Sequence, residues 1–217
     1  IESAWNYGTS FSRHFNLPNQ REASFTLDFY RTEFQNQVVV DLDHSSSEVH
    51  LFNLEGNSYS NSFQADLTGE FVKGLDLTLA YRFNDVKVDY LDGTLEKPFI
   101  NRHKGLFTAT YSTPFDKWSF DLTAQYNGPS RIPSTEMNPE EFRRENESPG
   151  FFIIHSQVTR RFKHFDIYTG VENLTGFRQE DAIISPDNPF GEHFDAGLIW
   201  GPLTGRMFYA GLRFKIM

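Results

Sequence analysis

Apolar and polar side chains alternate along much of this chain, most clearly over residues 59–71. The apolar set occupies odd positions and the polar set even ones: Tyr59, Phe63, Ala65, Leu67 and Phe71 against Ser60, Ser62, Gln64, Asp66, Thr68 and Glu70. Successive side chains of a β-strand point to opposite faces, so this pattern predicts a strand with one apolar and one polar face. The pattern resumes over 75–83 after a short turn at 72–74, which predicts a long hairpin.

The same alternation predicts an all-β, antiparallel, up-and-down chain with no competing helical segment. Nine strands are expected, at residues 2–15, 22–35, 49–71, 75–88, 103–113, 117–127, 150–162, 164–173 and 205–217. Charged and amide side chains occupy mid-strand positions of the polar faces, namely Asp66, Glu70, Arg82, Asp121 and Gln125.

Composition favours lipid over a soluble core as the environment of the apolar faces. Aromatic residues make up 16% of the chain, with 23 Phe, although only 38% is hydrophobic and mean hydropathy is −0.51. A soluble sandwich would also hide one face of each sheet, and its core would draw mainly on Leu, Ile and Val. No run of apolar residues is long enough for a transmembrane helix, whereas a transmembrane strand needs only about 9–11 residues.

Aromatic residues near the ends of the predicted strands point the same way. They are Tyr59, Phe71, Tyr81, Tyr111, Trp118 and Tyr126. Barrels of the outer membrane carry aromatic girdles at both membrane interfaces. We therefore expect one face of each strand to contact lipid and the other to line a hydrated lumen.

The connections between strands alternate in length. Short ones are expected at 16–21, 72–74, 114–116 and 163, and long ones, rich in Pro, Gly, Asn and charge, at 36–48, 89–102, 128–149 and 174–204. Short periplasmic turns and long outer loops are typical of outer-membrane barrels. Single-chain bacterial barrels have an even number of strands, so nine strands predict that residues 1–217 are part of a larger barrel.

Net charge argues against a general nucleic-acid-binding protein. The chain carries a formal charge of −9, whereas phosphate binding needs a basic surface. It has no cysteine, which excludes a disulfide framework and a thiolate site within it.

Four stretches resemble the TonB-dependent receptors. They are Phe29–Val39, Asn101–Gly105, Gly170–Thr175 and Gly205–Phe214. The third is the most specific, because Val171-Glu172-Asn173-Leu174 resembles the V-x-N-L end of that family's penultimate strand. The resemblance spans the chain, and its spacing suits strands 14 to 22 of a 22-stranded transmembrane barrel. It implies that residues 1–217 are the C-terminal part of the barrel, with the plug domain and energy-coupling box upstream.

The resemblance implies a transporter without a cofactor rather than an enzyme. A member of this family in the bacterial outer membrane captures a small molecule or chelate and imports it with energy supplied through TonB. Siderophores, haem, cobalamin, metals and oligosaccharides are all substrates of the family. Outer-membrane lipid and, through the upstream parts, TonB are the implied partners.

Five residues of the two longest loops are candidates for ligand contact. Arg131, Arg143 and Arg144 could hold an anionic ligand, since guanidinium matches carboxylate and phosphate geometry. The favoured alternative is a solvated loop of mixed charge. Phe190 and Trp200 could stack on a ligand. The favoured alternative there is packing of the loop against its neighbours.

Other motifs weigh less. The seven histidines show no ligand spacing, and Asp41-Leu42-Asp43-His44 lacks the continuation of a calcium loop. Adjacent Glu140 and Glu141 on a loop are a poor glycosidase pair, and no nucleophile motif is present. Two rival functions remain open at this point, a passive porin-like barrel and a soluble carbohydrate-binding β-sandwich.

Overall fold

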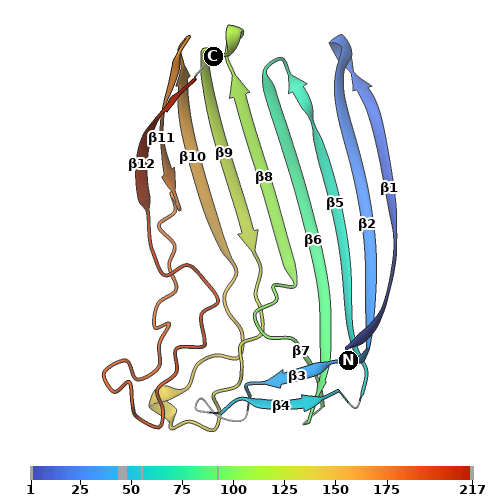
Figure 1. Cartoon of the computed structure of the whole chain (residues 1–217), viewed down its shortest axis with the longest axis vertical. Coiled ribbons are helices and arrows are strands. Elements are labelled where there is room, and N and C mark those ends of the chain that lie inside the picture. The colour runs from blue at the N-terminus through green and yellow to red at the C-terminus, as the bar shows by residue number, and fades with distance from the viewer. Residues whose placement is uncertain (1, 44–47, 55, 92, 216–217) are drawn as a thin grey trace.

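The computed structural model describes residues 2–43, 48–54, 56–91 and 93–215, and its main feature is one curved antiparallel sheet (Figure 1). The sheet order is β1-β2-β5-β6-β8-β9-β10-β11-β12, with β7 added to β6. The nine long strands are β1 (Ser3–Leu17), β2 (Arg21–Asn36), β5 (Ser58–Val72), β6 (Leu75–Tyr90), β8 (His103–Ser112), β9 (Trp118–Asn127), β10 (Phe151–Arg161), β11 (Phe165–Glu172) and β12 (Met207–Phe214). The predicted number and order of barrel strands are confirmed.

The prediction was wrong in the outer connections. The expected strand 49–71 is two elements, β4 (His50–Asn53) and β5, separated at residues 54–57. The expected loops 36–48 and 89–102 contain β3 (Val38–Asp41) and β7 (Gly93–Glu96). β3 pairs with β4 in a sheet of its own, so the residues around position 50 belong to this hairpin and not to a barrel strand. The last expected strand ends at Phe214, and residues 216–217 lie outside the described part.

Short turns gather at one end of the sheet and long connections at the other (Figure 1). Three connections hold short 3-10 turns: η1 (Pro18–Gln20) and η2 (Pro114–Asp116) at the turn end, and η3 (Glu140–Phe142) in an outer loop. Gly74 closes the β5–β6 turn with φ +77°, and a Cβ there would lie 2.5 Å from the carbonyl oxygen of Ser112. This position therefore requires glycine.

The apolar side chains form one continuous face across all nine strands. Strand pairing places Phe29 opposite Phe63, Phe63 opposite Phe83, and Leu79 opposite Phe107. On the same face, nearer the turn end, pairing connects Tyr111 in turn with Phe120, Val158, Thr169 and Ala210. Phe11, Leu79, Phe152 and Leu212 on this face are at least half exposed. The described strands form a single layer and place no second sheet on this face, which contradicts the soluble-sandwich alternative.

The exposed apolar face has the height of a membrane. Trp118 and Tyr126 lie at opposite ends of β9, about 27 Å apart at roughly 3.4 Å per residue. With a strand tilt of about 35–45°, this corresponds to a band slightly below the typical ~25 Å. No helix among the described residues is long and apolar enough to cross a membrane.

Above this band the outward face becomes polar. Arg31 donates to Asn61 at 3.0 Å, and Asn61 donates to Asp85 at 3.2 Å, across three paired strands. Glu33 accepts from Arg31 at 2.7 Å and from the hydroxyl of Tyr7 at 3.0 Å, and both bonds lower the pKa of Glu33. Charged networks of this kind belong in water. The strands β1, β2, β5 and β6 thus continue beyond the apolar band toward the loop end.

Candidate functional site

The outer connections form a packed assembly rather than separate loops. Figure 1 shows the β3–β4 hairpin lying across the strand direction at the loop end. Val39 and Leu54 of this region are buried with Val88 and Tyr90 from the end of β6. A second cluster joins Ile132 with Ile184 and Leu198, so that the two longest loops pack against each other. Apolar burial in two clusters fixes these loops at the mouth of the barrel wall.

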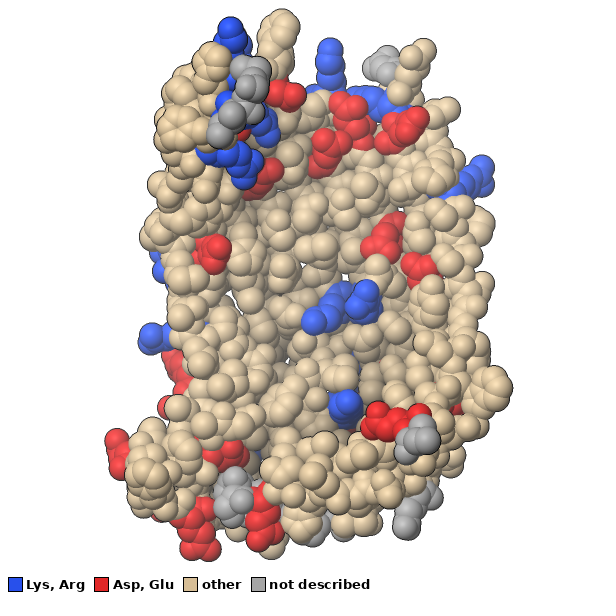
Figure 2. All heavy atoms as spheres, in the orientation of Figure 1, with Lys and Arg blue, Asp and Glu red and all other residues tan. Residues whose placement is uncertain are grey.

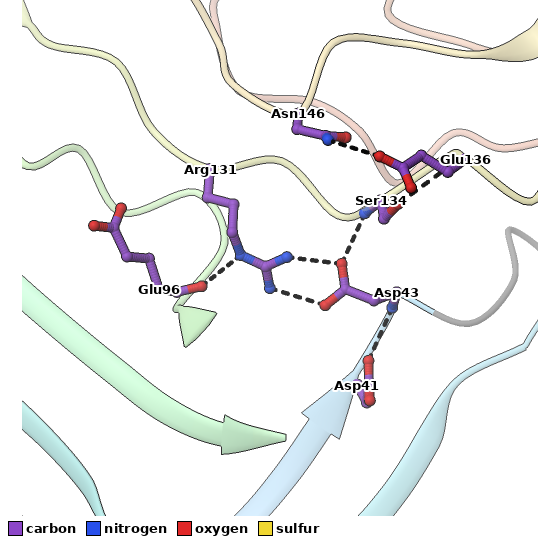
Figure 3. A network of polar contacts seen from close by, with 7 residues as sticks. All are labelled: Asp41, Asp43, Glu96, Arg131, Ser134, Glu136 and Asn146. Atoms are coloured by element: carbon purple, nitrogen blue, oxygen red, sulfur yellow. Dashed lines mark hydrogen bonds and ion pairs between the residues drawn. The ribbon is translucent and has the colours of Figure 1, made fainter. Parts of the chain in front are cut away.

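A partly buried ion pair links the hairpin to the loop between β9 and β10 (Figure 3). The guanidinium of Arg131 donates from both terminal nitrogens to the carboxylate of Asp43, each at 2.8 Å. The two side chains are 15% and 13% exposed. Arg131 also donates through Nε to the carbonyl oxygen of Glu96 at 2.6 Å, and Asp43 accepts the backbone N–H of Ser134 at 2.7 Å. One pair thus holds three outer connections together.

Burial and the neighbouring charges change the pKa values of Arg131 and Tyr90. Burial alone would lower the pKa of Arg131, but the hydrogen bonds and charge of Asp43 outweigh it and raise that pKa. Burial also raises the pKa of Tyr90, whose ring lies 5.5 Å from the guanidinium carbon of Arg131. Arg131 therefore stays charged, and its positive charge is compensated by Asp43.

The other predicted arginines lie nearby with different surroundings. Arg143 is exposed, and its Nε donates to the carbonyl oxygen of Asn138 at 2.9 Å. Arg144 is half-buried; a terminal guanidinium nitrogen donates to the carbonyl oxygen of Arg143 at 3.1 Å, and its buried Nε has no hydrogen-bond partner among the described residues. Arg144 lines a cavity of about 200 Å³ between the two longest loops.

The two predicted aromatic residues have opposite environments. Phe190 is 99% exposed. Trp200 is half-buried, packs on the cluster around Ile184, and lies with its ring 5.9 Å from that of Phe151. Trp200 also lines the same cavity as Arg144, together with Glu145, Glu147, Glu180 and Asp181. The structure thus brings Arg144 and Trp200 together and leaves Arg131, Arg143 and Phe190 outside this cavity.

Metal-binding groups do not converge in the described part of the chain. No set of three His, Cys, Asp or Glu side chains there has the arrangement of a metal site. Asp41 accepts the backbone N–H of Asp43 at 2.9 Å, and Asp43 is paired with Arg131, while His44 lies outside the described residues. Glu140 and Glu141 are exposed in η3.

Two buried amides that organise the last outer loop were not singled out from the sequence for this role. Asn173, with φ +50°, donates to the carbonyl oxygens of Phe177 at 2.6 Å and Thr204 at 3.2 Å. Gln179 donates to the carbonyl oxygen of Leu198 and accepts the backbone N–H of Trp200, at 2.7 and 2.8 Å. Asn tolerates the left-handed conformation, so the asparagine of the V-x-N-L motif both forms the turn and donates the hydrogen bonds that hold the loop.

Replacing Asn173 with alanine should destabilise the loop between β11 and β12 by about 1–3 kcal/mol, because two carbonyl oxygens lose their donor in a buried site. Asn173 is 5% exposed, so water cannot easily substitute. Limited proteolysis of residues 174–206 measures this, with Asn188→Ala in the same loop as control. Equal cleavage of the two variants would contradict the assignment.

Charge is divided unevenly between the barrel wall and the outer connections. The segments 37–57, 91–102, 128–150 and 173–206 together contain 16 acidic and 7 basic residues. The rest of the chain contains 13 of each, so these four segments carry the whole net charge of −9. A mouth lined by one sign of charge attracts cations and repels anions.

The concave face of the sheet forms the second part of the site. Figure 2 shows this face hollowed, with acidic and basic groups together at its upper end, acidic groups at its lower end and basic groups near its centre. The predicted inward residues Asp66, Glu70, Arg82, Asp121 and Gln125 share this face through strand pairing. A cavity of about 290 Å³ lies in the wall, lined by Gln64, Asp66, Arg82, Lys104, Gln125 and Asn127 among others.

Comparison with known proteins agrees with this geometry. A family model described as "TonB dependent receptor-like, beta-barrel" matches residues 2–174. The search of curated proteins finds no significant match.

Solved structures share the fold at low identity. The ferric-catecholate import receptor Fiu from E. coli aligns with a TM-score of 0.64 and 14% identity, covering 96% of this chain and 27% of that one. The pyoverdine outer membrane receptor FpvA from Pseudomonas aeruginosa PAO1 aligns with a TM-score of 0.66 and 12% identity, covering 99% and 30%. The copper transporter OprC gives 0.65 and 14%, covering 97% and 30%. This chain thus spans less than a third of the length of these proteins.

Proposed function

Because this chain belongs to the family of TonB-dependent receptor β-barrels, which lie in the bacterial outer membrane, we propose that it forms the C-terminal wall of a nutrient importer. In this proposal the apolar face contacts lipid, the concave face lines the lumen, and the outer connections receive a small molecule or chelate. The plug domain and the TonB-coupling segment belong to upstream parts of the same receptor. The chain itself is a transport element and not an enzyme.

One observation carries the proposal: a continuous sheet with an exposed apolar face ends in packed outer loops with a cavity of about 200 Å³ between them. A lipid-facing wall explains the first feature and a receptor mouth explains the second. The solved proteins of the same fold include siderophore receptors and a copper transporter, which supports a chelate or metal-loaded ligand as substrate.

The function is tested by uptake into cells that carry or lack the full-length receptor. Cells are given a panel of labelled ferric siderophores, haem, cobalamin and copper, with and without a proton uncoupler. The proposal expects accumulation of one class, lost in both the receptor deletion and the uncoupled cells. Receptor-dependent uptake that persists after uncoupling would identify a passive porin-like barrel instead.

Among the predicted contact residues, we propose Arg144 and Trp200 as direct ligand contacts, with Arg143 and Phe190 as contacts made by the rim. Arg131 is engaged by Asp43, so its proposed contribution is to hold the loops that form the mouth. Arg144 and Trp200 line the same cavity, which places a guanidinium group and an aromatic ring on one possible ligand site.

Arg144→Gln in the full-length receptor should weaken binding of the identified ligand by about tenfold, the effect of losing one charge-assisted hydrogen bond. Lys163→Gln, which removes the same charge in the short β10–β11 turn, is the matched control and should not change the affinity. Titration of both variants against the wild type measures this. An unchanged affinity for the Arg144 variant would remove this residue from the ligand site.

A further inference from the structure

Two basic side chains lie opposite each other on the lumen wall, at the loop ends of β8 and β9. Arg82 of β6 lies directly opposite Lys104 of β8 in the strand register, on the concave face, and both are exposed. Figure 2 shows basic groups near the centre of this face, with acidic groups above and below them. Like charges directly opposite each other destabilise a sheet. Such a pair therefore needs an explanation.

No carboxylate neutralises this pair at contact distance. Among the described residues, neither Arg82 nor Lys104 forms an ion pair within 4.0 Å. The carboxylate of Asp66 accepts Nε2 of Gln64 at 2.8 Å, and Oε1 of Gln64 accepts Nε of Arg82 at 2.7 Å. A second guanidinium nitrogen of Arg82 also donates to Gln64. The side chain of Gln64 thus orients the guanidinium of Arg82 and bridges it to the carboxylate of Asp66.

The surroundings of the pair are suited to an oxyanion. Arg82 and Lys104 line the cavity of about 290 Å³ with the side-chain amide residues Gln125 and Asn127. Asp66, held by Gln64, is the one carboxylate among the described residues that line this cavity. A guanidinium, an ammonium and two amides line this one cavity, and a carboxylate or similar oxyanion is the acceptor that suits such donors.

The cavity also lies at a defined level of the barrel. Lys104 is the second residue of β8 and Asn127 the last of β9, so the cavity is located where these strands end and the outer loops begin. An anion arriving from outside must pass connections that carry the whole net charge of −9. A carboxylate that belongs to the receptor's own lumen-filling part would avoid this barrier, since transporters with barrels of this size have a plugged lumen.

We propose that Arg82 and Lys104, with Gln125 and Asn127, form a carboxylate-binding site on the lumen wall. The carboxylate belongs either to a side chain of the part that fills the lumen or to the imported ligand. The inference rests on the proposed function only in placing the concave face inside a receptor barrel. It is independent of which nutrient is imported.

The test uses the full-length receptor and the double variant Arg82→Gln/Lys104→Gln. Its matched control is Lys87→Gln/Lys117→Gln, which removes two charges from outside the lumen wall: Lys87 shares the outward face with Tyr59, and Lys117 lies in the β8–β9 turn. Two quantities are measured for each protein: ion conductance in a planar bilayer without ligand, and binding of citrate by calorimetry.

If the carboxylate belongs to the lumen-filling part, the double variant should show a higher conductance than the wild type and the control, because the contact that holds this part against the wall is lost. If it belongs to the ligand, conductance should stay unchanged and citrate should bind the wild type and the control about tenfold more tightly than the double variant. Either result supports the site. Equal conductance and equal citrate binding in all three proteins would overturn the site. If the wild-type receptor shows no energy-dependent uptake in the earlier experiment, the proposed function fails while the site remains testable.

Discussion

Replacing Leu79 with arginine should lower the free energy of unfolding from the membrane by about 2–4 kcal/mol, the cost of a basic side chain near the middle of the bilayer. Leu79 is 57% exposed and lies on the outward face between Leu67 and Phe107. Its exposed surface is therefore the surface that meets lipid. Thr78 is the adjacent residue on the concave face, so Thr78→Arg is the matched control and should cost much less.

The comparison is made by urea titration of the full-length receptor folded into lipid vesicles, followed by tryptophan fluorescence and gel mobility. A shared loss of stability in both variants would indicate a general effect on the β5–β6–β8 region. If Thr78→Arg were the more destabilising change, the assignment of the two faces would be reversed. If Leu79 faces lipid and Thr78 faces the lumen, only Leu79→Arg should cause a large loss of stability.

Replacing Asp43 with alanine should open the outer assembly, because Arg131 would keep its charge in a site where it is only 15% exposed. Removing one partner of a buried ion pair costs about 3–5 kcal/mol, more than removing both. The backbone N–H of Ser134 would also lose its acceptor. The expected result is local: faster proteolysis of the segments 37–57 and 128–150 in a receptor whose strands remain folded.

The double variant Asp43→Asn/Arg131→Met separates the charge from the packing. It removes both charges and keeps similar side-chain volume, so proteolysis should return most of the way to the wild-type rate. Protease treatment of intact cells followed by mass spectrometry measures both variants. Identical cleavage of wild type and Asp43→Ala would show that the apolar clusters, and not the ion pair, hold the loops.

The barrel strands were predictable because their signal is local. Each long strand shows its two faces in its own residues, as at Trp118–Asn127, and the lengths of the connections gave their topology. The β3–β4 hairpin was missed because each of its strands has only four residues, which is too short for a clear period, and β4 lies only a few residues before β5. Periodicity alone does not say which sheet a short strand joins.

The mouth was less predictable than the wall, because its contacts join distant residues. Asp43 and Arg131 are separated by 88 positions, and neither sequence context indicates the other. Arg131 was expected to be a candidate ligand contact and is engaged in an ion pair. The V-x-N-L motif was noticed as a resemblance, but its physical role depends on Thr204, which only the folded loop brings to Asn173.

The placement of the two faces is tested most directly by single cysteines in the full-length receptor, since this chain contributes none of its own. A membrane-impermeant thiol reagent applied to intact cells should label Glu141→Cys, which is exposed in the outer loop. It should fail to label Phe63→Cys, Leu79→Cys and Phe120→Cys until the protein is unfolded in detergent. Equal labelling of all four positions on intact cells would contradict a lipid-facing wall.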